Sequence, residues 1–101
     1  MILIYTTHQD KASAEKITNE LLNEKLIACV NYLPIESCYC WNGKIESNDE
    51  IVALYKTKDS NWEKVRDKIE ELHSYETPCI IKIKAEANSS YEEWVDNETT
   101  I

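Results

Sequence analysis

The chain begins with an apolar run that is followed by a helical pattern. Ile2–Thr6 form a continuous apolar and β-branched run, which predicts a strand that is buried on both faces. Asp10 is a favourable N-cap residue for a helix that follows this strand. Apolar side chains then recur at helical spacing, at Ala14, Ile17, Leu21 and Leu22. We expect this helix to end near Lys25.

The middle of the chain has the pattern of one long β-hairpin. Ile27–Asn31 predict a second strand, and Pro34 predicts an edge position, a bend or a bulge, because proline cannot donate to a ladder. The strand resumes over Ile35–Trp41. Asn42-Gly43 predict a type I′ turn, since both residues tolerate positive φ, and Lys44–Lys58 form the returning arm. Both arms exceed the usual strand of about five or six residues, so we expect the hairpin to extend beyond its own domain.

The next segment predicts a second helix and a fourth strand. Ser60-Asn61-Trp62-Glu63 has the spacing of a capping box at a helix N-terminus. The helical stripe behind it consists of Trp62, Val65, Ile69 and Leu72. Cys79–Ala85 then predict a strand that carries Lys82 and Lys84 on its outer face.

The order of these elements predicts an α+β fold of the ferredoxin-like type, β-α-β-β-α-β. A short C-terminal helix follows, with Ser89 or Ser90 as its cap and with Tyr91, Trp94 and Val95 along it. Two helices can cover only one face of a four-stranded sheet. Because the first strand and the base of the third are apolar on both faces, we expect an identical subunit to cover the other face, which makes the protein a homo-oligomer.

Length, charge and cysteine content narrow the function classes. The chain has 101 residues, which is enough for a single domain over residues 1–101. Its formal net charge is -8 and its cations are scattered, so we expect no nucleic-acid binding. No apolar run approaches membrane-spanning length, and the N-terminus lacks the pattern of a signal peptide. Four cysteines without a secretory signal predict reduced thiols and a cytoplasmic location.

The cysteines are candidates for soft-metal binding. Cys38 and Cys40 stand two residues apart on a predicted strand and share one face, where two thiolates can bind a soft metal. A structural zinc site needs four ligands, and no second pair stands at a zinc spacing. We therefore favour small buried apolar residues at both positions, and also at Cys29 and Cys79.

The histidines and the single arginine do not form a catalytic set. His73 lies at the end of the second predicted helix, where it is either favoured by the helix dipole or available as a metal ligand. His8 is expected in the loop after the first strand, exposed to solvent. Arg66 falls on the polar side of the second helix, and no phosphate loop, zincin pair or serine elbow is present. We expect no catalytic residues and no enzymatic activity.

Several motifs occur in a characteristic order: Ala28-Cys29-Val30-Asn31, Pro34, Ser37-x-Tyr39-x-Trp41-x-Gly43-Lys44, Lys56-Thr57, His73-x-Tyr75-Glu76-x-Pro78 and Tyr91-x-x-Trp94. Over nearly the whole chain they resemble the CutA divalent-cation tolerance family. The resemblance implies a ferredoxin-like fold in a tight trimer whose long hairpins pair with neighbouring subunits. It also implies a role in the tolerance of copper and other divalent cations, without an established enzymatic activity. The trimer of that family resembles the PII signalling proteins, which implies a regulatory role as the alternative.

The resemblance carries over to individual residues only in part. His73 matches the histidine of the family's His-Pro-Tyr turn, which is tied to copper in some members. The proline of that turn is Ser74 here, and Cys79 replaces the acid that usually follows the next proline. Some members have a metal-linked cysteine at the end of the first strand, where this chain has Tyr5. The resemblance therefore implies an incomplete metal site with His73 as its ligand.

Five further motif positions gather near the subunit clefts of the family, namely Trp41, Lys56, Tyr75, Glu76 and Trp94. These side chains either hold the interface together, through aromatic area and a Lys–Glu pair, or line a ligand cleft. The favoured hypothesis is a non-enzymatic homotrimer of metal tolerance that requires no cofactor and binds copper or another divalent cation weakly. The alternative is a PII-like trimer that binds a small ligand in its intersubunit clefts.

Overall fold

The computed structural model describes residues 1–100 and shows a mixed α+β fold. Its elements are β1 (Ile2–His8), α1 (Lys11–Asn23), β2 (Cys29–Trp41), β3 (Lys44–Thr57), the short 3-10 turn η1 (Asp59–Asn61), α2 (Trp62–Leu72), β4 (Ile80–Lys84) and α3 (Ser89–Glu98). This order confirms the predicted β-α-β-β-α-β succession with a short C-terminal helix. The last residue of the expected domain, Ile101, lies outside the described residues.

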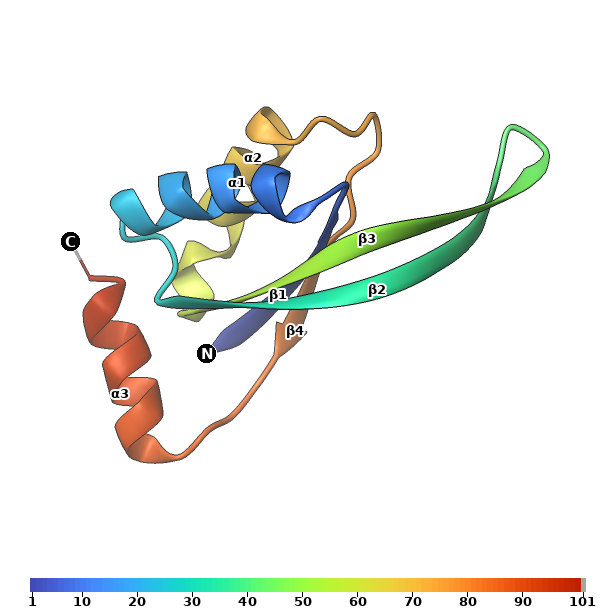
Figure 1. Cartoon of the computed structure of the whole chain (residues 1–101). Helices are drawn as coiled ribbons and strands as arrows, with labels where there is room; N and C mark the ends of the chain where they lie inside the picture. Colours follow the sequence, from blue (N-terminus) through green and yellow to red (C-terminus); the bar gives the residue numbers. More distant parts are fainter. Residues whose placement is uncertain (101) are drawn as a thin grey trace.

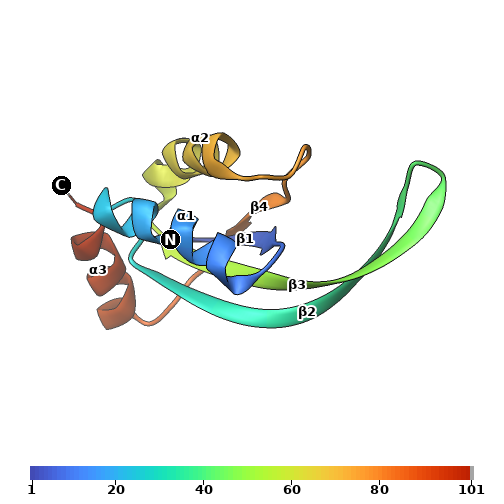
Figure 2. The same ribbon diagram turned by 45° about the horizontal axis from the view of Figure 1, so that its top comes forward.

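The four strands form one antiparallel sheet in the order β2-β3-β1-β4. This is the strand order of the split β-α-β arrangement. Helices α1 and α2 lie over one face of the sheet, and α3 lies at the end of the sheet where the chain begins (Figure 1). The β2–β3 hairpin projects away from the helices, which is clear in both views (Figures 1 and 2).

The core lies between α1, α2 and the sheet face that they cover. It consists of Ile2, Ile4, Ile17, Leu21, Leu26, Ile27, Ala53, Tyr55, Val65 and Ile69. Along β1 the residues alternate: Ile2 and Ile4 are buried against the helices, whereas Leu3 and Tyr5 are half-buried on the other face. The prediction that this strand is buried on both faces is therefore wrong for the single chain, because helices cover only one face.

The other sheet face is uncovered and apolar. Leu33 is 48% exposed, Ile81 49% and Ile83 41%. Ile83 pairs with Leu3 and Ile81 with Tyr5, so β1 and β4 present a continuous apolar strip on this face. This face is the one that the sequence predicted to need a second cover.

The lysines of β4 point the other way. Lys82 pairs with Ile4 and Lys84 with Ile2, which places both on the helix side of the sheet rather than on its outer face. The Lys82 ammonium lies 5.5 Å from the centre of the Trp62 ring on α2. The prediction was wrong because β4 is an edge strand. There a lysine stem can lie along the helix layer while its charged end stays in water.

The long hairpin is confirmed, with one difference at Pro34. The turn residues Asn42 and Gly43 both have positive φ, 52° and 78°, as a type I′ turn requires. Pro34 pairs with Ile51 inside a continuous β2 strand, so the predicted interruption is absent. β2 lies at the edge of the sheet, where a residue without an N–H is tolerated. The predicted edge position is therefore confirmed.

The helix ends agree with the sequence at α1 and differ from it at α2 and α3. The Asp10 carboxylate accepts a hydrogen bond from the Ser13 N–H at 2.8 Å, which confirms the predicted N-cap. Helix α1 ends at Asn23, and Leu22, which was expected in the buried stripe, is 41% exposed. Asn88 rather than a serine takes the N-cap position of α3. None of the described helices is long and apolar enough to cross a membrane.

The predicted capping box before α2 does not form. The turn η1 precedes the helix, and the N-cap position is taken by Asn61, whose side chain does not bond to the helix N-terminus. Its buried amide donates to the Leu26 carbonyl and to the Thr57 hydroxyl, both at 3.2 Å. Thr57 also donates to the Leu26 carbonyl at 2.7 Å. Asn61 therefore ties the start of α2 to the end of β3 and to the segment between α1 and β2.

The hydrogen bonds of Asn61, in place of the capping box expected at Ser60, predict that Asn61 stabilises the fold and that Ser60 does not. We expect Asn61→Ala to lower the free energy of unfolding by about 1–2 kcal/mol, because it leaves two buried oxygens with fewer donors. Ser60→Ala, at an exposed position, should change it by less than about 0.5 kcal/mol. Urea denaturation at one fixed protein concentration measures both. A larger loss for Ser60→Ala would show that the capping box forms after all.

Candidate functional site

A cleft lies between the hairpin and the loop that joins α2 to β4. Its volume is about 380 Å³, and it is lined by Thr7, Tyr39, Trp41, Glu50, Tyr75, Glu76, Thr77 and Cys79. Three of the five predicted cleft residues, Trp41, Tyr75 and Glu76, meet here. The other two, Lys56 and Trp94, do not line it.

A short hydrogen bond holds this cleft together. The Tyr75 hydroxyl donates to a carboxylate oxygen of Glu50 at 2.7 Å. Burial and this negatively charged acceptor both raise the pKa of Tyr75, so the phenol keeps its proton. Beside it, the Tyr39 hydroxyl accepts a hydrogen bond from the Asn48 amide at 2.6 Å. The cleft therefore combines aromatic faces with a carboxyl group that a hydrogen bond holds in place.

The cleft also contains a thiol whose pKa is raised. Cys79 is half-buried, and burial raises the pKa of its thiol. A raised pKa lowers the fraction of thiolate, which is the form that attacks substrates and binds metals. Cys79 therefore lacks the environment of a catalytic nucleophile.

Lys56 and Trp94 lie at the opposite end of the sheet. The Lys56 ammonium is 5.3 Å from the centre of the Tyr91 ring, and the rings of Tyr91 and Trp94 are 5.7 Å apart. Lys56 follows Glu50 by six positions on β3, which corresponds to roughly 20 Å along an extended strand. Within one chain, the predicted cleft residues therefore form two separate groups.

His73 lies at the end of α2, as predicted, and both of its ring nitrogens are occupied. Its Nε2–H donates to the Thr7 carbonyl at 2.8 Å, and its Nδ1 accepts from the Tyr75 N–H at 3.1 Å. These bonds fix the position of the loop that carries Tyr75. To bind a metal ion, His73 would have to give up one of them, so its predicted role as a ligand stays a prediction.

His8 differs most from its prediction. It is the last residue of β1, it is only 1% exposed, and its ring stacks on that of His73 with centroids 4.9 Å apart. The prediction of a solvated loop residue was wrong because pairing with Ile51 on β3 extends β1 beyond its apolar run. Burial, with a smaller contribution from His73, lowers the pKa of His8 from 6.5 to about 4.

The cysteines of the hairpin also differ from their prediction. Cys38 and Cys40 are both exposed in this chain, opposite Ser47 and Ile45 on β3. Residues 1–100 contain no group of three or more His, Cys, Asp or Glu side chains placed to hold a metal ion. A pair of thiols on one face of a strand is thus the nearest approach to a soft-metal site on the hairpin.

Several cleft residues were not predicted from the sequence, for different reasons. Tyr39 shares a strand face with Trp41, and this spacing of two could have placed it in the cleft. Glu50 belongs to the polar part of the returning arm, where no local pattern sets it apart from its acidic neighbours. Only the strand register brings it to Tyr75.

The depressed pKa of His8 predicts a stability that depends on pH. The folded state holds His8 neutral down to about pH 4, whereas the unfolded chain protonates it near 6.5. The contribution is fully present above about pH 6.5 and is lost as the pH falls towards 4. We expect a loss of about 2–3 kcal/mol across this window from His8 alone.

Urea denaturation at pH 4, 5, 6 and 7 tests this expectation at one protein concentration. His8→Phe keeps an aromatic ring on His73 and removes the titration, so its stability should fall less between pH 7 and pH 4 than that of the unchanged protein. Equal slopes for the two proteins would contradict the assignment.

Comparison with known proteins agrees with this geometry. A divalent-cation tolerance protein CutA from Pyrococcus horikoshii is 44% identical over 100 residues, which cover 98% of each chain. A crystal structure of CutA1 from the same organism superposes with a TM-score of 0.97 at 43% identity, covering 100% of both chains. A PII-like protein CutA from Nostoc sp. PCC 7120 has a TM-score of 0.91 at 30% identity, covering 99% of this chain and 98% of that one.

The sequence profile of the CutA1 divalent ion tolerance proteins matches residues 2–98. The match runs from β1 to the end of α3, so it includes both groups of cleft residues. This chain belongs to the CutA1 divalent ion tolerance protein family.

Proposed function

We propose that this chain forms a non-enzymatic homotrimer of divalent-cation tolerance, which binds copper or a related cation weakly in clefts between its subunits. The observation that carries the proposal is the division of the cleft residues into two groups at opposite ends of one uncovered sheet face. Family membership supplies the link to divalent cations, since the relative from Pyrococcus horikoshii is named for their tolerance.

The uncovered face supports assembly. Ile81, Ile83 and Leu33 are between 41% and 49% exposed, although large apolar side chains gain free energy on leaving water. The projecting hairpin gives each chain an arm that can reach a neighbour, and the molecule is 45 Å long but only 25 Å and 21 Å across. In the proposed trimer, Trp41 on the arm of one chain and Tyr75 on its α2–β4 loop lie beside Lys56 and Trp94 of the next.

The cleft offers donors that suit a divalent cation. Glu50 and Glu76 line it with carboxylates and Cys79 with a thiol that a metal ion can deprotonate on binding, but within residues 1–100 the three are not placed as one ligand group. Donors from the neighbouring subunit or water molecules would complete the coordination of the metal ion. Such a mixed set of donors fits weak rather than tight binding. His73 joins this set only if Nδ1 releases the Tyr75 N–H.

The absence of catalysis is part of the proposal. The Cys79 thiol has a raised pKa, and the ring nitrogens of His73 are both engaged in holding the loop. Neither group is therefore prepared to act as a nucleophile or a general base. The four free cysteines suit a reducing compartment, and we place the protein in the cytoplasm.

A PII-like signalling module is the second candidate. The cleft is lined by the aromatic side chains of Tyr39, Trp41 and Tyr75, which can stack on a planar ligand. The similarity to the PII-like CutA of Nostoc also supports the signalling hypothesis. A thermal-shift screen of nucleotides separates it from metal tolerance, because a ligand of the folded state raises the melting temperature.

The oligomer is tested with two substitutions at equally exposed positions. Ile83 on the uncovered face and Leu22 on α1 are both 41% exposed in the single chain. We expect Ile83→Glu to dissociate or strongly weaken the trimer, because it places a charge in each buried interface. Leu22→Glu should leave it intact. Sedimentation velocity at micromolar concentrations measures both, and a folded monomer of the unchanged protein would refute the trimer.

Metal binding is tested by calorimetric titration of the assembled protein with Cu²⁺. We expect Glu76→Gln to weaken binding by about fivefold or more, since it removes one anionic donor from the cleft. Glu63→Gln, at an exposed position on α2, is the matched control and should change nothing. A loss of binding in His73→Gln with full binding in Glu76→Gln would place the metal on the imidazole instead.

A further inference from the structure

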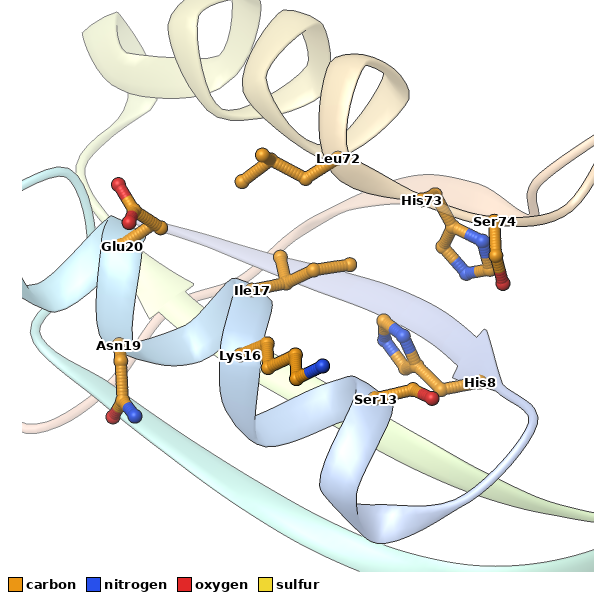
Figure 3. Close-up of a pocket in the computed structure, with 9 residues that line it drawn as sticks. All are labelled: His8, Ser13, Lys16, Ile17, Asn19, Glu20, Leu72, His73 and Ser74. Atoms are coloured by element: carbon orange, nitrogen blue, oxygen red, sulfur yellow. The ribbon is translucent and has the colours of Figure 1, made fainter.

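A second hollow lies on the helix side of the molecule, away from the cleft. It is a groove of about 560 Å³ between α1 and the C-terminal end of α2, lined by His8, Ser13, Lys16, Ile17, Asn19, Glu20, Leu72, His73 and Ser74 (Figure 3). The helices lie on the opposite side of the sheet from the uncovered face. The groove therefore stays accessible in an assembly that buries that face.

One buried atom at this groove lacks a partner. The Thr6 hydroxyl donates to the Ala53 carbonyl at 2.9 Å, so it must accept the other bond, at 2.7 Å, from the Nε2–H of His8. The proton of the neutral ring is thereby placed on Nε2, and Nδ1 keeps its lone pair. This Nδ1 is buried and has no hydrogen-bond partner among residues 1–100, although the side chain is 1% exposed.

A buried acceptor without a donor is costly and rare in folded proteins. The contrast with His73 is informative, because that ring stacks on His8 and has both nitrogens satisfied. Of the two stacked rings, His73 thus has partners at both nitrogens, whereas His8 has a partner only at Nε2. Because His8 lines a groove, this indicates that a bound molecule donates the missing hydrogen bond to its Nδ1.

The groups around Nδ1 define the chemistry of that molecule. Figure 3 shows the Lys16 side chain extending along the groove beside Ser13 and His8. Lys16 forms no ion pair within the described part of the chain. A cation and a hydroxyl next to an acceptor favour an anion that also carries a donor. They disfavour a metal ion, which Lys16 would repel.

We propose that this groove binds a small carboxylic acid with a hydroxyl or ammonium group on the adjacent carbon. The carboxylate pairs with Lys16 and accepts from the Ser13 hydroxyl, and the adjacent group donates to His8 Nδ1. Ile17 and Leu72 provide an apolar wall for the rest of the ligand. None of the groove residues lines the cleft, and the groups that would hold this ligand, Lys16, Ser13 and His8, take no part in the metal and nucleotide proposals above.

Binding is measured by NMR titration of the full chain with lactate and with alanine, which separate the hydroxy acids from the amino acids. Propionate is the matched probe without a donor. A ligand of this size is expected to bind with a Kd of about 1–10 mM. Long-range ¹H–¹⁵N spectra of the histidines should show the Nδ1 resonance of His8 moving on binding while Nε2 stays protonated.

Two variants localise the site. Lys16→Met keeps the aliphatic stem and should weaken lactate or alanine binding by about tenfold, whereas Lys64→Met, at an exposed position on α2 outside the groove, should leave it unchanged. Propionate should bind more weakly than the better of the two ligands.

Three results would overturn the proposal. The first is a His8 Nδ1 resonance that stays constant with both ligands up to about 50 mM, which would mean that water alone satisfies the atom. The second is equal affinity for propionate, and the third is equal affinity in Lys16→Met.

Discussion

Two helices can cover only one face of this four-stranded sheet, and that limit shapes the rest of the molecule. The covered face holds the core, where Ile4 and Tyr55 are completely buried. On the opposite face Ile81 and Ile83 are exposed to water. The projecting β2–β3 hairpin also has nothing to pack on within its own chain. Both features leave the single chain with unpaired apolar surface, and the proposed association through this surface would cover both.

The central strand β3 separates the two groups of cleft residues. Glu50 and Lys56 lie on the same face of β3, since they are an even number of residues apart, and each stands in a different group of cleft residues. An extended strand cannot bring its own residues together. The two groups could meet only if the end of one chain lay against the arm of another, so the proposed function, which uses both, requires that association.

Periodicity and turn chemistry were enough to predict the element order, the Asp10 cap and the Asn42-Gly43 turn, because these depend on neighbours in the sequence. What could not be predicted depends on register. The end of β1 is set by pairing across the sheet, which turned His8 from an expected loop residue into a buried one. The Tyr75–Glu50 hydrogen bond likewise joins two chain segments that are far apart in the sequence and that no local pattern connects.

The two histidines show how position decides the role of one residue type. The resemblance pointed to His73, whose hydrogen bonds instead hold the loop that forms the cleft, while the neighbouring His8 keeps a free lone pair at the groove on the helix side of the sheet. The two sites are nevertheless adjacent in structure. Thr7 lines the cleft and its carbonyl accepts from His73, which stacks on His8 at the groove. Since neighbouring strand residues face opposite sides, the end of β1 serves both sites at once.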